Sequence, residues 1–308
     1  MQAHAPHSWM RWFKKNVLRN WMLYLFVLPS FIYITLFQYG PLYGIQIAFR
    51  NYKPARGIWN STWVGFKYFE KFLTSYNCLE LIRNTLVLSF YELLMFPVPI
   101  LLALVVHYTP IRALRKATQS ITYAPYFISV VVMCGMITTF FSSTGIVNQI
   151  IKLFGGNAVD FMNYEEYWRG LYVGSGVWRT SGYNAVIYIA ALAGVSPELH
   201  EAATVDGANR MQRIWHIDIP SILPTIVILL ILRCGRIMSV GFQKAYLLQN
   251  DLNLGVSEII STYVYKMGLQ KGQYSLSTAV GLFNNIINFL LVISVNKISR
   301  KLTGSSLW

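Results

Sequence analysis

The chain has 308 residues, of which 55% are hydrophobic and 12% charged, whereas ordinary soluble domains carry roughly a quarter charged residues. Its 26 Lys and Arg against 12 Asp and Glu give a net charge of +14, and its mean hydropathy is +0.42. The composition excludes an ordinary soluble domain. The charge does not indicate nucleic acid, because membrane proteins also gather Lys and Arg in cytoplasmic loops and no basic patch lies in a foldable soluble segment.

Two local features narrow the class further. Cys78, Cys134 and Cys234 lack metal-type spacing, so we expect buried small hydrophobes rather than a zinc site or a disulfide framework. The basic N-terminal segment "MRWFKKNVLRN" precedes a long apolar run without a small-residue cleavage site. This pattern predicts an uncleaved first membrane span rather than a signal peptide.

Six apolar runs are each near the length that crosses about 30 Å of hydrocarbon as a helix. They do not alternate as the strands of a closed barrel would. We therefore predict an all-α, polytopic membrane protein, with residues 1–308 forming a single transmembrane domain. The predicted spans are Trp21–Gln38, Leu86–Val106, Ile121–Phe141, Leu171–Gly194, Ile219–Val240 and Ser277–Val295.

Basic residues predict the orientation of these spans. With six spans, three segments without acidic residues share one side, and they carry Arg11, Lys14, Lys15 and Arg19; Arg112, Arg115 and Lys116; and Lys297, Arg300 and Lys301. The positive-inside rule makes that side, and both termini, cytoplasmic. The segment from Arg50 to Arg83 is also basic but falls outside, so we interpret residues 49–85 as a folded, aromatic-rich extracytoplasmic cap.

A polar stretch, "ELHEAATVDGANRMQRIWHIDIPSILPTI", separates the fourth and fifth spans and would be cytoplasmic. Pro197 and Glu198 begin a good helix-forming segment, with acidic residues in its early turns. Asp206-Gly207 breaks it, since Gly tolerates the φ of a tight turn. A second helix would follow and end or bend at Pro220. Residues 195–220 thus predict a compact elbow suited to docking into a cleft on a partner.

The elbow resembles the coupling-loop (EAA) signature of permease subunits of binding-protein-dependent ABC importers, with Ile219 where Leu is usual. "WVGFKYFEKFL" and "RNTLVLSF" also look like the carbohydrate branch that carries oligosaccharides and polysaccharides. The residues that match in order and spacing are Glu201, Ala202, Ala203, Asp206, Gly207, Ala208, Ile217, Pro220 and Pro224.

The resemblance implies a type I importer fold and a set of partners. A second related permease would complete the channel, a cytoplasmic ATPase dimer would receive the elbows, and an extracytoplasmic solute-binding protein would deliver an oligosaccharide. Glu201 would contact the ATPase, Ala202 and Ala203 would allow close approach, and Gly207 would make the turn. Arg210 and Arg213 are either further docking charges or solvated side chains. The location implied is a bacterial cytoplasmic (inner) membrane, with lipid around the spans.

The sequence contains no GxxxxGK[ST] phosphate loop and no soluble segment long enough for a nucleotide domain. We therefore expect no enzyme site and no cofactor in this chain, with ATP and Mg²⁺ bound by the partner ATPase. No metal site is expected either, and His200 and His216 receive no role.

Ionisable residues within spans are costly and need a reason. At 1.5 Å per residue, Arg233 and Arg236 lie about 20 and 24 Å into the fifth span, and Arg179 lies about 13 Å below the outer surface. These arginines either line a shared pathway or play a structural part, by pairing with Glu92 or a partner's acid or by snorkelling. The fourth span contains four glycines in "GLYVGSGVWRTSGYNAV", which we interpret as a broken span near a binding site.

Other side chains suit a sugar. Trp178 and Tyr183 offer aromatic faces, although packing or an interface belt explains them equally well, and Asn184, Asn284 and Asn288 offer amides. Guanidinium groups match carboxylates in a bidentate way, so uronate oligomers such as alginate or pectin fragments are the preferred cargo. The three arginines and the family resemblance together suggest similarity to alginate importers, and a neutral oligosaccharide is the alternative.

Three other classes have weaker support. A secondary transporter needs carboxylates within its spans and an internal repeat, but only Glu92 is present and no repeat is visible. A membrane enzyme needs a catalytic constellation such as HExxH, which the sequence lacks. A structural scaffold would leave the elbow and the buried arginines unexplained.

Overall fold

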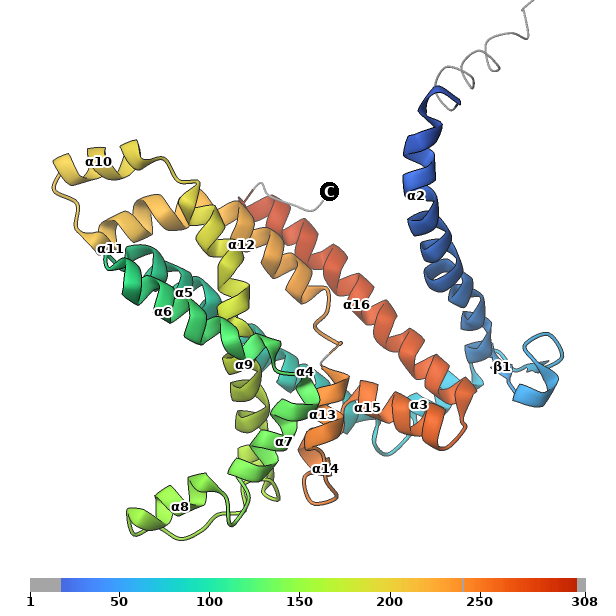
Figure 1. The fold of residues 1–308 in the computed structure, drawn as a ribbon. Coiled ribbons are helices and arrows are strands. Elements are labelled where there is room, and N and C mark those ends of the chain that lie inside the picture. The colour runs from blue at the N-terminus through green and yellow to red at the C-terminus, as the bar shows by residue number, and fades with distance from the viewer. Residues whose placement is uncertain (1–17, 240, 304–308) are drawn as a thin grey trace, which may run out of the picture. The chain divides into compact units, whose positions relative to one another are not determined.

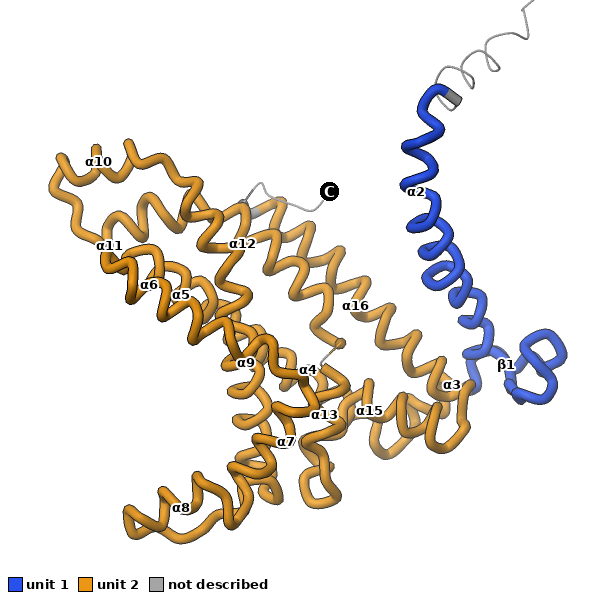
Figure 2. Tube along the Cα trace, in the orientation of Figure 1, with its two compact units in different colours: residues 1–67 blue, residues 68–308 orange. Residues whose placement is uncertain are grey.

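The structure, a computed structural model, describes residues 18–239 and 241–303. The predicted cytoplasmic residues Arg11, Lys14 and Lys15 lie outside this part of the chain. The described residues are helical except for one two-stranded sheet and the connecting turns. They form two compact units, residues 1–67 and 68–308, which are described separately (Figure 2).

The first unit contains the N-terminal span and a small hairpin. Helix α2 (Trp21–Ile34) buries none of its residues and continues through η2 (Thr35–Tyr39) and η3 (Gly40–Phe49), as a lipid-facing span would. Strands β1 (Arg50–Asn51) and β2 (Thr62–Trp63) then pair antiparallel around η4 (Pro54–Arg56). The Arg50 guanidinium closes the hairpin by donating to the carbonyls of Trp59 and Ser61, at 3.2 and 3.0 Å.

The predicted cap does not form one structural segment. Its first part belongs to the hairpin, whereas α3 (Lys67–Leu73) places Phe72 in a buried cluster of the second unit. Phe72 is 1% exposed and its ring lies 5.6 Å from that of Phe283. An amphipathic helix of this kind packs on the nearest apolar surface, which the sequence alone did not identify.

The second unit is a helical bundle (Figure 1). Its helices after α3 are α4 (Cys78–Leu94), α5 (Pro97–Tyr108), α6 (Arg112–Tyr123), η5 (Ala124–Phe127), α7 (Val130–Phe140), α8 (Ile146–Leu153), α9 (Glu165–Ala193), α10 (Pro197–Val205), α11 (Arg210–Arg213), η6 (Ile214–Asp218), α12 (Ile219–Cys234), α13 (Phe242–Leu248), α14 (Leu254–Ser257), α15 (Ile260–Tyr265), η7 (Lys266–Gln270) and α16 (Tyr274–Thr303).

Each predicted span coincides largely with helical structure, although the helix of the fifth ends at Cys234 and Val240 lies outside the described residues. By length and hydropathy, four helical stretches among the described residues can cross a membrane, and a fifth is added if the bent pair of residues 112–127 and 130–140 is one span. The four are Trp21–Phe49, Cys78–Tyr108, Arg210–Cys234 and Tyr274–Lys301. The remaining predicted span lies in α9, whose N-terminal half carries charged residues.

The break in the bundle is in the third span and not in the fourth. Helix α9 runs unbroken for 29 residues through all four glycines, so the predicted interruption there is wrong. Glycine costs a helix only about 1 kcal/mol, which packing on several neighbouring helices outweighs. The third span instead bends by 99° between η5 and α7. The second span is also interrupted, between α4 and α5, just before Pro97.

Helix α9 holds the bundle together. Its Gly182 lies so close to the Thr122 carbonyl of α6 that a Cβ would overlap this oxygen. Toward its N-terminus, the Trp168 indole is buried and donates to the Leu248 carbonyl of α13 at 2.9 Å. The cysteines are free and buried, as predicted.

Candidate functional site

A cavity of about 530 Å³ opens within the second unit, between α4, α7, α9, α12 and α13. Much of its lining is apolar, as expected of a ligand pocket. Its charged side chains are Glu92, Arg179, Arg233 and Lys244, so three cations face one carboxylate, and Asn184 and Tyr172 add polar groups.

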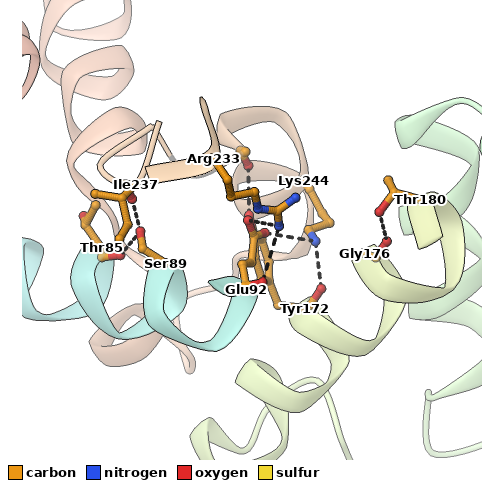
Figure 3. A network of polar contacts seen from close by, with 10 residues as sticks. Thr85, Ser89, Glu92, Tyr172, Gly176, Thr180, Arg233, Ile237 and Lys244 are labelled. Atoms are coloured by element: carbon orange, nitrogen blue, oxygen red, sulfur yellow. Dashed lines mark hydrogen bonds and ion pairs between the residues drawn. The ribbon is translucent and has the colours of Figure 1, made fainter. Parts of the chain in front are cut away.

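Arg233 and Glu92 form a loose ion pair in this cavity (Figure 3). Nη2 of Arg233 lies 3.4 Å from Oε2 of Glu92, and the two side chains are 40% and 28% exposed. This confirms the pairing that the sequence offered as one alternative for Arg233. A partly exposed pair contributes roughly 0–1 kcal/mol, so another carboxylate can replace Glu92 at little cost.

Lys244 is the cation that the sequence did not reveal. Its side chain is almost fully buried, and Nζ donates to the Tyr172 carbonyl at 2.8 Å while lying 3.9 Å from Oε1 of Glu92 (Figure 3). The same Nζ faces the Tyr172 ring, 3.7 Å from its centroid, and this contact stabilises a desolvated ammonium. Lys244 follows the predicted fifth span in sequence, but α13 turns back into the bundle. A lysine soon after a span was its only sequence signal.

Arg179 of α9 lines the cavity and also hydrogen-bonds a backbone carbonyl that the break in the third span leaves without a helical partner. Its Nε donates to the carbonyl of Ile128 at 2.9 Å, where the residue between η5 and α7 has left the helix. Its guanidinium carbon lies 5.5 Å from the centre of the Tyr126 ring. The arginine therefore has a structural contact in addition to its place in the lining.

Of the remaining predicted pathway residues, only one lies in the cavity lining. Asn184 lines the cavity, but Arg236 follows the end of α12 and is not in the lining. Trp178 lines a different, apolar hollow, and Tyr183 stacks on Tyr126 with ring centroids 3.8 Å apart.

Two predicted asparagines instead support the backbone after α12. The Asn288 amide accepts from Met238 N–H at 2.9 Å and donates to the Ser239 hydroxyl, while Asn284 donates to the Met238 carbonyl at 3.1 Å. Both are 8% exposed and neither lines the cavity. These contacts give both asparagines a structural role, because the helix end leaves backbone groups that need partners, and the pathway role expected of them stays a prediction.

The predicted elbow is present between α9 and α12. Helix α10 ends in a Schellman motif, in which the N–H of Ala208 donates to the Ala203 carbonyl and the N–H of Gly207 to that of Thr204, at 2.8 and 3.1 Å. Gly207 has a φ of +79°, the left-handed conformation that this motif requires. The spacing between the "EAA" and "DGA" segments thus places Gly207 where the C-terminal motif of α10 requires a glycine.

The second half of the elbow merges with the fifth span. Asn209 and Gln212 form a capping box at the start of α11, with hydrogen bonds of 3.0 and 2.7 Å. The backbone continues through the π-helical η6, which contains Ile217, directly into α12. Pro220 therefore does not end this helix, which was one of the two outcomes predicted for it.

The outer side of the elbow is uncovered in this chain. Helix α10 has no buried residue, and the side chains of Glu201, Ala202, Asp206 and Arg210 are exposed, as predicted for a docking surface. Large apolar side chains are exposed beside these charges: Leu199, Val205, Met211 and Trp215. Val205 is 88% exposed and, with these neighbours, adds apolar surface beside the charges of the elbow.

Residues 79–304 match the family model described as binding-protein-dependent transport system inner membrane component. The chain belongs to this family of ABC importer permeases. The matched region includes both the cavity and the elbow.

Individual relatives cover almost the whole permease. It is 43% identical over 310 aligned residues to the polygalacturonan/rhamnogalacturonan transport system permease protein YteP of Bacillus subtilis (strain 168), covering 97% of both chains. In a crystal structure of a bacterial ABC transporter involved in the import of the acidic polysaccharide alginate, a chain is 40% identical, with a TM-score of 0.88 over 94% of this chain and 98% of that one. A second alginate transporter structure, in complex with alginate pentasaccharide-bound periplasmic protein, matches with 38% identity and a TM-score of 0.89, covering 96% and 100%. The predicted class, an integral inner-membrane permease with the type I fold, is confirmed.

Proposed function

We propose that this permease forms half of the translocation channel of an ATP-driven importer for acidic oligosaccharides of the uronate type. The observation that carries the proposal is the cavity with three cations and one carboxylate. Arg233 and Lys244 share the carboxylate of Glu92, so an incoming uronate finds cationic groups that are incompletely neutralised.

The relatives support an acidic cargo. Alginate is named as an acidic polysaccharide in the transporter with the 40% identical chain, and the 43% identical permease is named for polygalacturonan, a polymer of uronic acid. The cavity volume of about 530 Å³ is of the size that small-molecule sites have, so it suits one or two sugar rings at a time.

Energy would come from a separate ATPase dimer that binds ATP and Mg²⁺. The exposed charges and apolar side chains of the elbow are suited to a groove on that subunit, with Glu201 as the charged contact and Gly207 holding the turn. The elbow, and with it both termini, would lie on the cytoplasmic side. ATP binding would move the elbows, and a permease pair would alternate between inward-open and outward-open states.

Two further partners complete the proposal. A second, related permease would supply the other half of the channel as a heterodimer, and an extracytoplasmic solute-binding protein would deliver the sugar. The alginate transporter described with an oligosaccharide-bound periplasmic protein supports the latter partner.

A neutral oligosaccharide is the second candidate cargo. It is favoured by the internal partners of the cations, because Arg179 donates to the carbonyl of Ile128 and Arg233 to that of Glu92 as well as to its carboxylate. If these contacts persist during transport, the cavity would present mainly amides and aromatic rings.

The two candidates are separated by ATPase stimulation in the reconstituted complex. We expect binding protein loaded with a uronate trisaccharide to stimulate ATP hydrolysis, and a neutral trisaccharide of equal length to stimulate it weakly. Replacing Lys244 by Met is expected to reduce uronate stimulation about 10–100-fold, since a hydrogen bond to a charged group contributes roughly 1.5–3 kcal/mol.

Lys266→Met is the matched control, because Lys266 pairs with Glu258 at 2.9 Å and lies outside the cavity lining. It should leave stimulation within about twofold of the parent, as expected for a partly exposed pair. Equal stimulation by both sugars, unchanged in Lys244→Met, would contradict the acidic cargo and favour the neutral one.

A further inference from the structure

A group of potential metal ligands lies at the inner end of the elbow, away from the cavity. His107 comes from the last turn of α5, His200 from α10, and Asp218 from the end of η6. One ligand atom of each lies within 4.8 Å of the others. Three elements distant in sequence thus bring two imidazoles and a carboxylate together.

The carboxylate of Asp218 has a hydrogen bond to one oxygen only, while its other oxygen lies at ion-pair distance from His200. The residue is fully buried, and Oδ2 accepts a hydrogen bond of 2.6 Å from the Tyr108 hydroxyl. Oδ1 has no hydrogen-bond partner among the described residues, and neither has Nε2 of His200, although the two atoms lie 3.2 Å apart. An unsatisfied buried carboxylate oxygen is costly, and it requires a positive charge or a donor nearby.

We propose that His107, His200 and Asp218 form a binding site for a divalent transition-metal ion of the Zn²⁺ class. Two ligand atoms about 2.0–2.1 Å from a tetrahedral Zn²⁺ are about 3.3 Å apart, close to the separation of 3.2 Å between Nε2 and Oδ1. The third ligand, the imidazole of His107, has its ligand atom within 4.8 Å of the other two, so it needs to approach by at most about 1.5 Å.

The surrounding groups fit such an ion. The Tyr108 hydroxyl orients the carboxylate, as outer-shell hydrogen bonds do in metal sites. Arg115 donates to the Thr109 carbonyl at 2.9 Å and Arg213 to the Thr204 hydroxyl at 3.3 Å, so the carboxylate of Asp218 is left to the two histidines and the Tyr108 hydroxyl. Three protein ligands leave a position for water, so binding is expected to be exchangeable.

The bound ion would tie the elbow to the membrane core, because α10 and η6 of the elbow contribute two ligands while α5 contributes the third. Metal binding would thereby alter the motion of the elbow. This effect on motion rests on the proposed coupling function, whereas the binding of the ion does not. The binding claim is tested without nucleotide or sugar, so its failure is distinct from a failure of the proposed function.

The test is a Co²⁺ titration of the purified, nucleotide-free and chelator-washed complex, followed by visible absorption, with Zn²⁺ as the competitor. The chain has five histidines, so the parent carries substitutions of His4 and His7, and no polyhistidine tag is used. His200→Ala and His107→Gln remove ligands. His216→Ala is the matched control, since this exposed histidine of η6 bonds the Gln212 carbonyl instead.

We expect one equivalent of Co²⁺ per permease to give tetrahedral absorption bands that Zn²⁺ abolishes, in the parent and in His216→Ala. Both ligand variants should lose these bands while the complex elutes intact. Tyr108→Phe, which keeps all three ligands, should weaken binding about 10–100-fold. Equal titrations of the parent and His200→Ala, or no bands in the parent, would overturn the proposal and leave a His–Asp ion pair.

Discussion

At the scale of single residues, the cavity depends on how its charges are shared. Glu92 has two cationic neighbours: Arg233 lies 3.4 Å from its carboxylate and Lys244 lies 3.9 Å from it. Both distances are longer than that of a tight ion pair. Arg179 already donates to a backbone carbonyl. Lys244 and Arg233 are therefore the groups best placed to bind an acidic sugar, and Glu92 keeps them in position until it arrives.

The asparagines of α16 that hydrogen-bond the backbone after α12 lead to a prediction about the stability of the permease. Replacing Asn288 by Leu removes the acceptor for the Met238 N–H inside the bundle and should destabilise the permease by about 1–3 kcal/mol. Thermal unfolding of the purified complex should show the loss. The ratio of uronate to neutral stimulation should stay unchanged, and a changed ratio with normal stability would support the pathway role of Asn288.

These residues show which parts of the site a sequence can reveal. Arg179 and Arg233 stood out because a charge within an apolar run is costly. Lys244 did not, since the backbone after Cys234 leaves the helix and α13 returns into the bundle. Asn284 and Asn288 were recognised as polar side chains within an apolar run, but only the structure identified the backbone groups that they satisfy.

At the scale of elements, the elbow was predictable and the broken span was not. A proline start, a helix-forming segment and Asp-Gly are local signals, and they correctly placed α10 and its Schellman end. The 99° bend in the third span has one local signal, Pro125 of η5, but the proline predicts neither the angle nor the partner of the freed carbonyl, Arg179 of a different helix. The glycines of α9 were misread as a break, although Gly182 serves a close helix contact.

Two glycines of α9 form a matched pair for testing this explanation. Gly182→Ala should destabilise the permease by about 1–3 kcal/mol, because the new Cβ would overlap the Thr122 carbonyl of α6. Gly174→Ala, where a Cβ meets nothing within 4 Å, should be neutral or stabilising by up to about 1 kcal/mol. Thermal unfolding of both purified variants measures the two changes in stability. Equal changes in the two variants would contradict the close-contact role of Gly182.

At the scale of the whole molecule, the permease has to join a sugar pathway to an energy source that it does not contain. Helix α9 links the two regions in the second unit, since it lines the cavity and its C-terminus leads into α10. Composition, span length and the elbow motif were sufficient to predict the family. The sharing of the predicted cap between two compact units depended on tertiary packing of Phe72 and was not predictable.

The most direct test of this account is the stimulation of ATP hydrolysis by sugar-loaded binding protein in the reconstituted complex, comparing Glu201→Ala with Glu198→Ala. Both acids are exposed on α10, but only Glu201 belongs to the coupling signature. We predict that Glu201→Ala lowers stimulation about 10–100-fold, as expected for a lost charged hydrogen bond, and that Glu198→Ala stays within about twofold of the parent. Full stimulation in Glu201→Ala, with the complex intact, would contradict the claim that this elbow couples the permease to its ATPase.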